Sequence, residues 1–410
     1  MKTALSFDDV LLVPRMSEIE SRKDVDLSSV LKYTDYDESL DLLTGYEFSL
    51  PIISSPMDTV TGRDMMRAMH HAGGLGVGHR YCSIEEQVEM VRPTISHPFK
   101  KKEAKQDLKT TPKEAFTGKG YPFAPQWDKV YIDPHHSPRG LNRSLNNGRA
   151  DFDLDYKEYS HTAAAAIGVT GDFLERAQEL VKAECKILCI DVAHGHHTSV
   201  KKALKKLKKQ FGDDVVLIAG NVATARAFEH LSDWGADAIR VGIGGGSICS
   251  TRIQTGHGVP TLQSIIDCAE SEGDAKIIAD GGIRNAGDIV KCLAAGADFA
   301  MLGSLLAGTD QTPGQVFTSA EGNKYKVYRG MASAEAQIDW RGKAKSLEGV
   351  STTIPWKGSV KKILKDLEQN IRSGLSYSGA TSIDDLYNSA KFIKQTQAGL
   401  RESFTHILSR

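Results

Sequence analysis

The sequence has almost no excess of charge of either sign. Its 51 lysine and arginine residues balance 52 aspartate and glutamate residues, which leaves a net charge of −1. A chain with this balance has no overall electrostatic field to attract nucleic acid or an anionic membrane. We therefore expect neither as a partner, and any recognition of phosphate must be local.

The sequence also lacks a cysteine framework and long apolar runs. Its six cysteines show none of the short paired spacings typical of zinc sites or disulfide-rich folds. No stretch reaches the roughly 18 apolar residues of a transmembrane helix. The first residues, MKTALSFDDVLLVP, lack the apolar segment of a signal peptide. These absences predict free thiols and a soluble, cytoplasmic protein.

From about residue 185 onward, short apolar runs alternate regularly with amphipathic stretches. The expected strands are Ile187–Val192, Val215–Ala219, Ala238–Val241, Lys276–Ala279 and Phe299–Leu302. Helical periodicity separates them, as in residues 200–211 and 286–295. Small or polar residues follow each run, at the position where a barrel builds its active site. The pattern predicts an α/β fold, a (β/α)8 TIM barrel with a loop insertion.

Residues 97–160 interrupt this pattern. They hold a lysine cluster, recurring prolines and glycines and an acidic end, without periodicity. We predict that residues 1–96 and 161–410 form the barrel and that residues 97–160 are an insertion in one of its loops. An irregular surface excursion and a partner-binding or assembly element are both open interpretations of the insertion.

A glycine-rich loop at residues 241–252, VGIGGGSICSTR, carries the strongest chemical signal. Glycines let a ligand approach the backbone closely, and a thiol such as Cys249 becomes a nucleophile when its pKa is lowered. A tight turn with an incidental thiol explains the loop equally well. However, Asp280-Gly-Gly and Gly303-Ser304 follow the last two expected strands, where barrels bind phosphate. Together the loops favour a nucleophile that faces a phosphorylated ligand.

These motifs resemble those of the IMP dehydrogenase / GMP reductase family. The resemblance covers the chain except residues 97–160, and it includes LSFDDVLLVP (5–14), SSPMDTVTG (54–62), DVAHGH (191–196), GIGGGSICSTR (242–252), ADGGIRNAGD (279–288) and YRGMAS (328–333). It implies a purine nucleoside monophosphate as substrate, a nicotinamide cofactor and a homotetramer. The GxGxxG fingerprint of dinucleotide-binding folds does not follow any expected strand.

The resemblance also implies roles for individual residues. Cys249 is the nucleophile that adds to purine C2, with Thr251 and Glu348 as its catalytic partners. The substrate-binding residues that it implies are Met57, Asn221, Ser247, Asp280, Gly281, Gly282, Gly303, Ser304, Tyr328, Gly330, Met331, Ala332, Lys345 and Gly349. The cofactor-binding residues are Ser21, Arg22, Arg80, Asp191, Val192, Ala193, Ile243, Gly244, Ser373 and Ser376. A potassium site is implied at Gly244, Gly246, Cys249 and Arg252. Gly245 stands where the family usually has proline.

Residues Ala334–Pro355, here called the flap segment, separate the two chemistries of the family. Dehydrogenases carry there an Arg-Tyr pair that activates water to hydrolyse the covalent adduct. Reductases have a shorter segment and use a Thr-Glu pair to move protons as ammonia leaves. The flap segment of this chain has 22 residues and no tyrosine, and Thr251 and Glu348 match the reductase pair. The resemblance therefore favours an NADPH-dependent GMP reductase.

Two other functions stay open at this point. The first is an IMP dehydrogenase that uses NAD with an atypical flap, because SSPMDTVTG and DVAHGH look more like dehydrogenase motifs and Arg341 is a nearby basic group. The second is a non-catalytic nucleotide-binding or assembly protein. The choice between NADPH and NADH is also open, because an arginine such as Arg22 or Arg80 suits a 2′-phosphate but equally suits a solvated surface.

Overall fold

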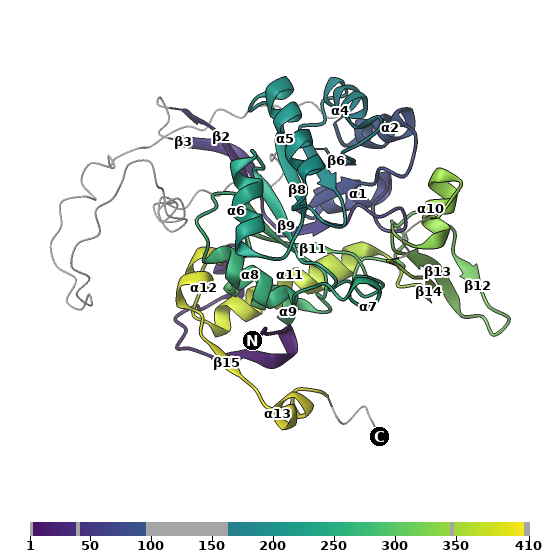
Figure 1. Ribbon diagram of the computed structural model, residues 1–410. Coiled ribbons are helices and arrows are strands. Elements are labelled where there is room, and N and C mark those ends of the chain that lie inside the picture. Colours follow the sequence, from purple (N-terminus) through teal and green to yellow (C-terminus); the bar gives the residue numbers. More distant parts are fainter. Residues whose placement is uncertain (1–2, 38–41, 96–162, 345–347, 406–410) are drawn as a thin grey trace, which may run out of the picture. The chain divides into compact units, whose positions relative to one another are not determined.

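The computed structural model describes residues 3–37, 42–95, 163–344 and 348–405 (Figure 1). Eight parallel strands form a closed barrel in chain order, and β11 returns to pair with β4 through Met301 and Ile53. The strands are β4 (Ile52–Ser54), β5 (Leu75–Gly78), β6 (Ala164–Ile167), β7 (Ile187–Asp191), β8 (Val216–Val222), β9 (Ala238–Val241), β10 (Lys276–Asp280) and β11 (Phe299–Leu302). The chain is thus a (β/α)8 barrel, as its sequence predicts.

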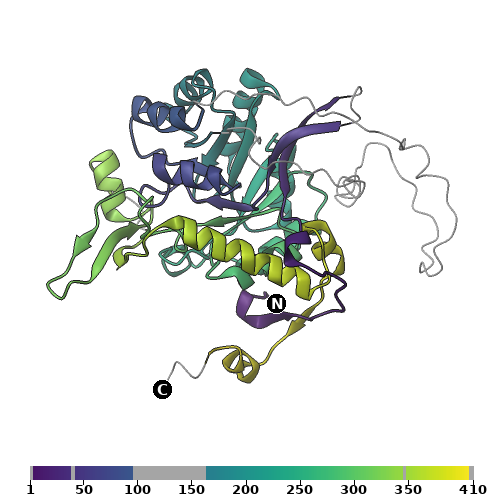
Figure 2. The ribbon, with the colours of Figure 1, turned by 180° about the vertical axis from the view of Figure 1, so that it is seen from behind.

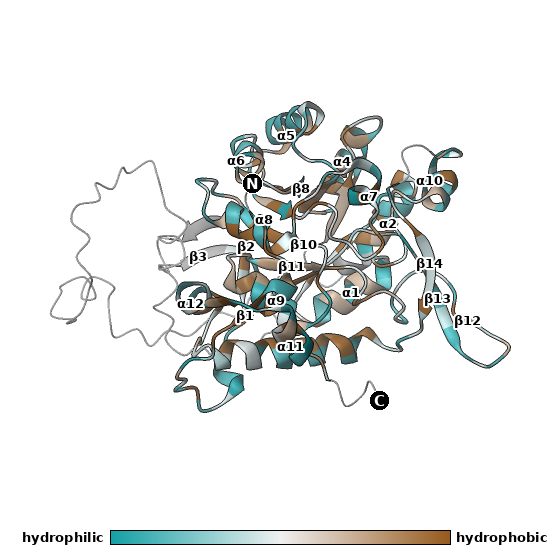
Figure 3. Ribbon diagram, turned by 60° about the horizontal axis from the view of Figure 1, so that its bottom comes forward, coloured by the Kyte–Doolittle hydropathy of each residue, from teal (hydrophilic) through white to brown (hydrophobic). Residues whose placement is uncertain are grey.

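Helices cover the outside of the barrel (Figures 1 and 2). They are α1 (Arg63–His71), α2 (Ile84–Ile95), α4 (Phe173–Lys182), α5 (Thr198–Phe211), α6 (Ala225–Asp233), α8 (Thr261–Ala269), α9 (Ala286–Ala294) and α11 (Val360–Tyr377). Their sequences explain this position, because each presents an apolar stripe to the strands. In α11 the buried residues are Val360, Leu364, Leu367, Ile371 and Leu375, and Figure 3 shows hydrophobic and hydrophilic stretches alternating along this helix.

Two apolar clusters stabilise the barrel. The inner cluster fills the space enclosed by the strands with side chains such as Ile53, Ile187, Ile218 and Phe299. The outer cluster lies between strands and helices. Alternate residues of one strand belong to different clusters, because successive side chains of a strand point to opposite faces. Both faces are therefore buried, which explains why the strands appear in the sequence as continuous apolar runs.

Short sheets lie outside the barrel. β1 (Val10–Leu12) pairs with β15 (Phe392–Lys394), and β2 (Ser29–Asp37) pairs with β3 (Leu42–Phe48). A three-stranded sheet contains β12 (Phe317–Thr318), β13 (Lys324–Arg329) and β14 (Ser351–Pro355). The helix α10 (Ala334–Arg341) leads out of this sheet after β13. The remaining helical elements are η1 (Phe7–Asp9), η2 (Arg22–Asp24), α7 (Thr251–Thr255), α12 (Ile383–Ser389) and α13 (Gln397–Glu402).

The five strands expected from residue 185 onward are all present, with bounds that differ by at most a few residues. The first 95 residues supply two further barrel strands, β4 and β5. The insertion at residues 97–160 lies outside the described residues. In the part of the chain that the structure describes, no helix combines the length and the apolar character needed to cross a membrane.

Candidate active site

A cavity of about 490 Å³ opens at the carboxyl ends of the barrel strands. Loops that follow β4, β5, β7, β8, β9, β10 and β11 contribute to its wall, as do the residues on either side of α10. Parallel strands of a barrel end on one face, so residues distant in the sequence meet there. The cavity contains all three residues expected to be catalytic, Cys249, Thr251 and Glu348.

The three catalytic candidates form a hydrogen-bonded chain. The Cys249 thiol donates to the Thr251 hydroxyl over 3.2 Å, and the Thr251 hydroxyl donates to Oε2 of Glu348 over 2.8 Å. A proton can therefore pass from the sulfur to the carboxylate through one hydroxyl group. In this chain the carboxylate is the base and the threonine hydroxyl relays the proton to it from the nucleophilic thiol.

The backbone fixes the distance between the thiol and the carboxylate. Cys249 forms an antiparallel bridge with Gly349, and the Ser250 amide donates to the Glu348 carbonyl over 3.0 Å. The Val350 amide donates in the same way to the Ile248 carbonyl, also over 3.0 Å. Thr251 begins α7, so its hydroxyl lies between the two bridged segments. The geometry of the chain of three groups is thus built by main-chain contacts.

The turn between β9 and Cys249 requires glycine at two positions. Gly242 has a φ of 146°, and a Cβ atom there would lie 1.9 Å from the Asp280 carbonyl oxygen. Gly244 has a φ of 80°, and a Cβ atom would lie 2.5 Å from Cγ of Arg252. Other residues adopt such backbone angles rarely. The turn packs closely against the next loop and brings the cysteine to the cavity wall.

A buried arginine organises the acidic side of the cavity. Arg240 of β9 donates to Oδ1 of Asp191 over 2.5 Å and to Oδ2 of Asp280 over 2.9 Å. Burial disfavours its charge, but the facing carboxylates of Asp280 and Asp191 raise the pKa of Arg240 above its ordinary value. Asn221 also donates to Oδ2 of Asp280, over 2.8 Å. These contacts fix the orientation of both carboxylates.

Hydroxyl groups and main-chain amides gather at another part of the wall. Ser247 and Tyr328 approach each other with 3.5 Å between their hydroxyl oxygens, and burial raises the pKa of Tyr328. Gly303 and Ser304 follow β11 and also line the cavity. Lys357 donates to the Ser304 carbonyl over 2.6 Å from outside the cavity wall. This part of the wall offers hydrogen-bond donors to an anion, while the Lys357 ammonium is engaged with the Ser304 and Leu305 carbonyls.

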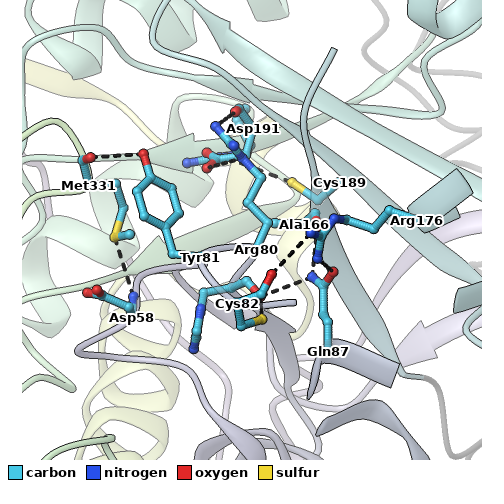
Figure 4. A network of polar contacts seen from close by, with 12 residues as sticks. Asp58, Arg80, Tyr81, Cys82, Gln87, Ala166, Arg176, Cys189, Asp191 and Met331 are labelled. Atoms are coloured by element: carbon cyan, nitrogen blue, oxygen red, sulfur yellow. Dashed lines mark hydrogen bonds and ion pairs between the residues drawn. The ribbon is translucent and has the colours of Figure 1, made fainter. Parts of the chain in front are cut away.

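Most of the expected binding residues line this one cavity. The expected substrate-binding residues there are Met57, Asn221, Ser247, Asp280, Gly281, Gly282, Gly303, Ser304, Tyr328, Gly330, Met331, Ala332 and Gly349. Lys345 lies outside the described residues. The expected cofactor residues there are Arg80, Asp191, Val192, Ala193, Ile243 and Gly244, and Figure 4 shows Arg80 beside Asp191. Gly246 and Cys249 of the expected potassium site also line it.

Five expected residues do not line the cavity. The Ser21 side chain caps η2, which begins with Arg22, and the Ser376 hydroxyl donates to the Ser373 carbonyl on α11. These four residues lie on or beside two adjacent elements, because α11 packs against η2. Arg252 turns away from the cavity and donates to the Val259 carbonyl over 2.7 Å. A role of these residues toward a ligand stays a prediction.

The sequence reasoning missed several cavity residues, among them Arg240, Tyr81 and Gln337, whereas Arg341, named for the dehydrogenase alternative, does line the cavity. A signal for Arg240 was present, because a charged residue inside an expected central strand needs a partner. Tyr81 follows the carboxyl end of β5, which is the criterion that found the other loops. Gln337 and Arg341 belong to α10, whose place at the cavity no local pattern indicates.

Comparisons with known proteins agree with this geometry. The family model for the IMP dehydrogenase / GMP reductase domain matches residues 4–406. An inosine-5′-monophosphate dehydrogenase of Nitrosopumilus maritimus is 36% identical, with 99% of this chain and 98% of that protein covered. A GMP reductase of Leishmania major is 35% identical, with 99% and 97% covered.

A solved structure is similar over nearly its whole length. It is the crystal structure of a cysteine-to-alanine variant of GMP reductase from Trypanosoma brucei in complex with guanosine 5′-monophosphate. It is 32% identical in sequence, covers 99% of this chain and 98% of that chain, and has a TM-score of 0.79. Members of the family are oxidoreductases that act on purine nucleoside monophosphates with a nicotinamide cofactor. The chain described here belongs to the IMP dehydrogenase / GMP reductase family.

Proposed function

We propose that the protein is an NADPH-dependent GMP reductase, which converts GMP, NADPH and a proton into IMP, NADP⁺ and ammonia. The observation that carries the proposal is the hydrogen-bonded chain from Cys249 through Thr251 to Glu348. The flap segment adds support, because none of its residues is a tyrosine that could act with an arginine on water.

The chain of three groups can perform the deamination. As the Cys249 sulfur bonds to purine C2, its proton passes through Thr251 to the Glu348 carboxylate. The carboxylic acid then gives this proton to the 2-amino group through the same hydroxyl, and ammonia leaves. NADPH supplies the hydride that C2 then accepts. The C2–sulfur bond breaks, IMP forms, and the thiolate takes up a proton from solvent.

The rest of the cavity suits the two ligands. The hydroxyl groups of Ser247 and Tyr328 and the amides of Gly303 and Ser304 would hold the phosphate, which explains how the chain can bind phosphate without a basic surface. Asp280, held by Arg240, would accept hydrogen bonds from the ribose hydroxyls. Asp191, Val192 and Ala193 would contact the nicotinamide riboside.

A paired assay tests the proposal. The purified protein is given GMP with NADPH, and separately IMP with NAD⁺, and the purine products and ammonia are identified. We expect NADPH oxidation that depends on GMP, with one ammonia per IMP. Loss of all turnover in Cys249→Ala is the control for contaminating enzymes. Formation of XMP from IMP and NAD⁺, without reduction of GMP, would refute the proposal.

IMP dehydrogenase is the second candidate, and one observation favours it. Arg341, at the end of α10, lines the cavity, so a guanidinium group can reach the reacting centre from the flap segment. In an IMP dehydrogenase of this kind, Arg341 alone would activate the water that hydrolyses the covalent adduct, without help from a tyrosine. Arg341→Gln should abolish XMP formation in that case, whereas a GMP reductase should retain its deamination step in this variant.

Other properties of the protein are part of the same proposal. A potassium ion would be held by the carbonyl groups of Gly244, Gly246 and Cys249 on the turn after β9, and replacement of potassium by sodium in the assay tests this. A homotetramer in the cytoplasm is proposed from the resemblance, and light scattering measures the subunit number. A preference for NADPH over NADH is also proposed, and the ratio of the kcat/KM values measured with the two cofactors tests it.

A further inference from the structure

The main chain of Met331 is held in place from outside its own loop. Met331 lies in the turn between β13 and α10, and with Gly330 and Ala332 it lines the cavity. The Tyr81 hydroxyl donates to the Met331 carbonyl over 2.9 Å, and the Asp58 amide lies 3.4 Å from the Met331 sulfur (Figure 4). The loops after β4 and β5 thus both contact Met331, which belongs to the turn of residues 330–333, here called the flap turn.

The ring of Tyr81 is part of a stack that reaches α10. Trp340, at the end of α10, has its ring centroid 5.7 Å from that of Tyr81. The guanidinium of Arg80 lies 5.3 Å from the Tyr81 centroid, and that of Arg176 lies 5.8 Å from the Trp340 centroid. Both cations are close enough to be attracted by the ring faces. The stack therefore joins α10 to α4 through aromatic and cationic groups.

Arg176 is a rigid base for this stack. Its side chain is only 3% exposed, and it donates to Oδ2 of Asp172 over 2.8 Å, to Oε1 of Gln87 over 2.9 Å and to the Cys82 carbonyl over 3.1 Å. Figure 4 shows the contact of Arg176 with Gln87. Because its donors are engaged with fixed groups, Arg176 cannot follow a movement of α10. Trp340 therefore packs on an immobile surface.

The other described contacts of helix α10 are mostly small or exposed, apart from Gln337, which donates to the Ala332 carbonyl over 3.1 Å. Its buried residues are Ala336 and Gln337, and Ile338 on its outer side is 51% exposed. Asp339 receives a hydrogen bond from Arg329 over 2.5 Å, but the Asp339 side chain is 64% exposed. Exposed ion pairs of this kind contribute little to docking. Trp340 is the aromatic side chain of α10, and it packs on Tyr81 and Arg176 of the barrel, while Gln337 and Arg341 face the cavity.

We propose that Tyr81, Trp340 and Arg176, here named the flap clasp, dock α10 on the barrel and position the Met331 carbonyl group. The Gly330 amide and the Gly330 and Ala332 carbonyls are hydrogen-bonded within the protein. When Tyr81 also holds the Met331 carbonyl, the peptide planes of residues 330–332 are fixed, and the amides of Met331 and Ala332 are presented to the purine base in one arrangement. The three residues are positioning residues, since they act on the substrate through the backbone of the flap turn. The inference rests on the proposed function only in that a purine nucleotide occupies the cavity.

Burial keeps the clasp in its donating form. It raises the pKa of Tyr81, so the hydroxyl stays protonated and can donate to Met331 throughout the neutral range. The hydrogen bond is the one polar contact of Tyr81 with the flap turn among the contacts described above. Tyr81→Phe removes only the hydroxyl and keeps the ring with its stacking, so it tests the hydrogen bond to Met331 by itself.

The experiment compares Tyr81→Phe, Trp340→Ala and Trp340→Phe with the unaltered protein. For each we would measure kcat, the KM for the nucleotide and the hydrogen exchange of residues 330–341. Tyr81→Phe should raise KM about five-fold with kcat nearly unchanged, as expected for the loss of one hydrogen bond. Trp340→Ala should raise KM and lower kcat, each about ten-fold, and accelerate exchange over 334–341. Trp340→Phe, which keeps a ring, should recover most of both values.

Matched controls separate the clasp from general effects of losing an aromatic group. Tyr325→Phe alters a tyrosine that stacks on Phe317, 5.7 Å away, in the outer sheet. Trp234→Ala removes a tryptophan that also lies under a cation, Nζ of Lys201 at 5.6 Å. Neither lines the cavity, so both variants should keep wild-type kinetic constants and wild-type exchange over residues 330–341.

The outcomes distinguish the clasp from the proposed reaction. If the protein oxidises IMP and does not reduce GMP, the same variants are measured in that direction, and the expected KM changes are the same. If it has no turnover, calorimetric nucleotide affinity replaces KM. Wild-type KM or affinity in Tyr81→Phe, together with unchanged exchange over 334–341 in Trp340→Ala, would overturn the clasp. Should Trp340→Ala fail to fold, Tyr81→Phe and Trp340→Phe decide the question.

Discussion

Glu348→Gln is the substitution that tests the proton path most directly. Glutamine keeps the length of the side chain and can still accept the hydrogen bond that Thr251 donates to Oε2 over 2.8 Å. The backbone contacts of Glu348 do not involve its side chain, so the bridge beside Cys249 should persist. The substitution therefore removes the ability to take up a proton and leaves the geometry in place.

The magnitude follows from the part that the carboxylate plays. A positioned general acid or base contributes about 10² to 10⁴ in rate, which is roughly 3 to 5 kcal/mol of barrier. We expect kcat of Glu348→Gln to fall by this factor while the KM for GMP changes less than about three-fold. The assay is NADPH oxidation together with the rate of ammonia release. Thr251→Val should give a similar loss, and the double variant should be no worse than Glu348→Gln, because the two groups act as one unit.

Glu335→Gln is the matched control for Glu348→Gln. Glu335 is an exposed carboxylate on the first turn of α10 and does not line the cavity. Glu335→Gln should keep the wild-type kcat. If Glu348→Gln also keeps it, the carboxylate does not carry the proton. If instead KM rises and kcat is unchanged, Glu348 binds the substrate and another group handles the proton.

Three further predictions concern the scaffold of the site. A Cβ atom on Gly245 would lie 2.6 Å from the Thr261 hydroxyl. Gly245→Pro, which introduces the residue usual in the family, should therefore lower the free energy of unfolding in urea by about 1 to 3 kcal/mol. Adding Thr261→Ala should restore the stability, and equal stability of Gly245→Pro and the unaltered protein would contradict the reasoning. Arg240→Leu should lower the free energy of unfolding by about 3 to 5 kcal/mol, because it leaves two carboxylates without their shared cation, and a loss under 1 kcal/mol would show that they are solvated. Burial lowers the pKa of His79 from its ordinary 6.5. As the pH falls below about 6.5, the unfolded chain therefore binds this proton before the folded chain does, and the free energy of unfolding should fall. His79→Gln should reduce the dependence of the free energy of unfolding on pH between roughly pH 5 and 7, and an unchanged dependence would exclude His79 as its source.

The fold was largely predictable from the sequence, except for strands such as β5 and β6, whose residues do not form a typical strand pattern. The strands after residue 185 appear as mostly apolar runs because both of their faces are buried. β6, Ala164–Ile167, consists mostly of alanine and carries no such signal. β5, Leu75–Gly78, contains two glycines, and a Cβ atom on Gly76 would lie 2.6 Å from Cα of Met66. Close packing of helix on strand selects small residues here, and this need is not a local property of the sequence.

The candidate site was predictable where it depends on strand ends and not where it depends on packing between distant segments. Asp280 ends a barrel strand, and Cys249 and Ser304 lie in loops that follow strands, so their convergence follows from the barrel itself. The resemblance, rather than spacing, pointed to Glu348, which is brought to the cysteine by a bridge over about a hundred residues of chain. Tyr81 and Trp340 meet through α10, and no pattern in either segment indicates the other.

The bridge between Cys249 and Gly349 joins the barrel to a segment that takes no part in the barrel sheet. Amino-acid changes in the flap segment can therefore alter the groups that meet the covalent adduct while the eight parallel strands and the turn of the nucleophile stay as they are. The barrel loop thus supplies the thiol and the threonine hydroxyl, and a segment outside the barrel sheet supplies the carboxylate that meets them. The carboxylate can therefore be exchanged for another group without any change in the packing of the barrel strands.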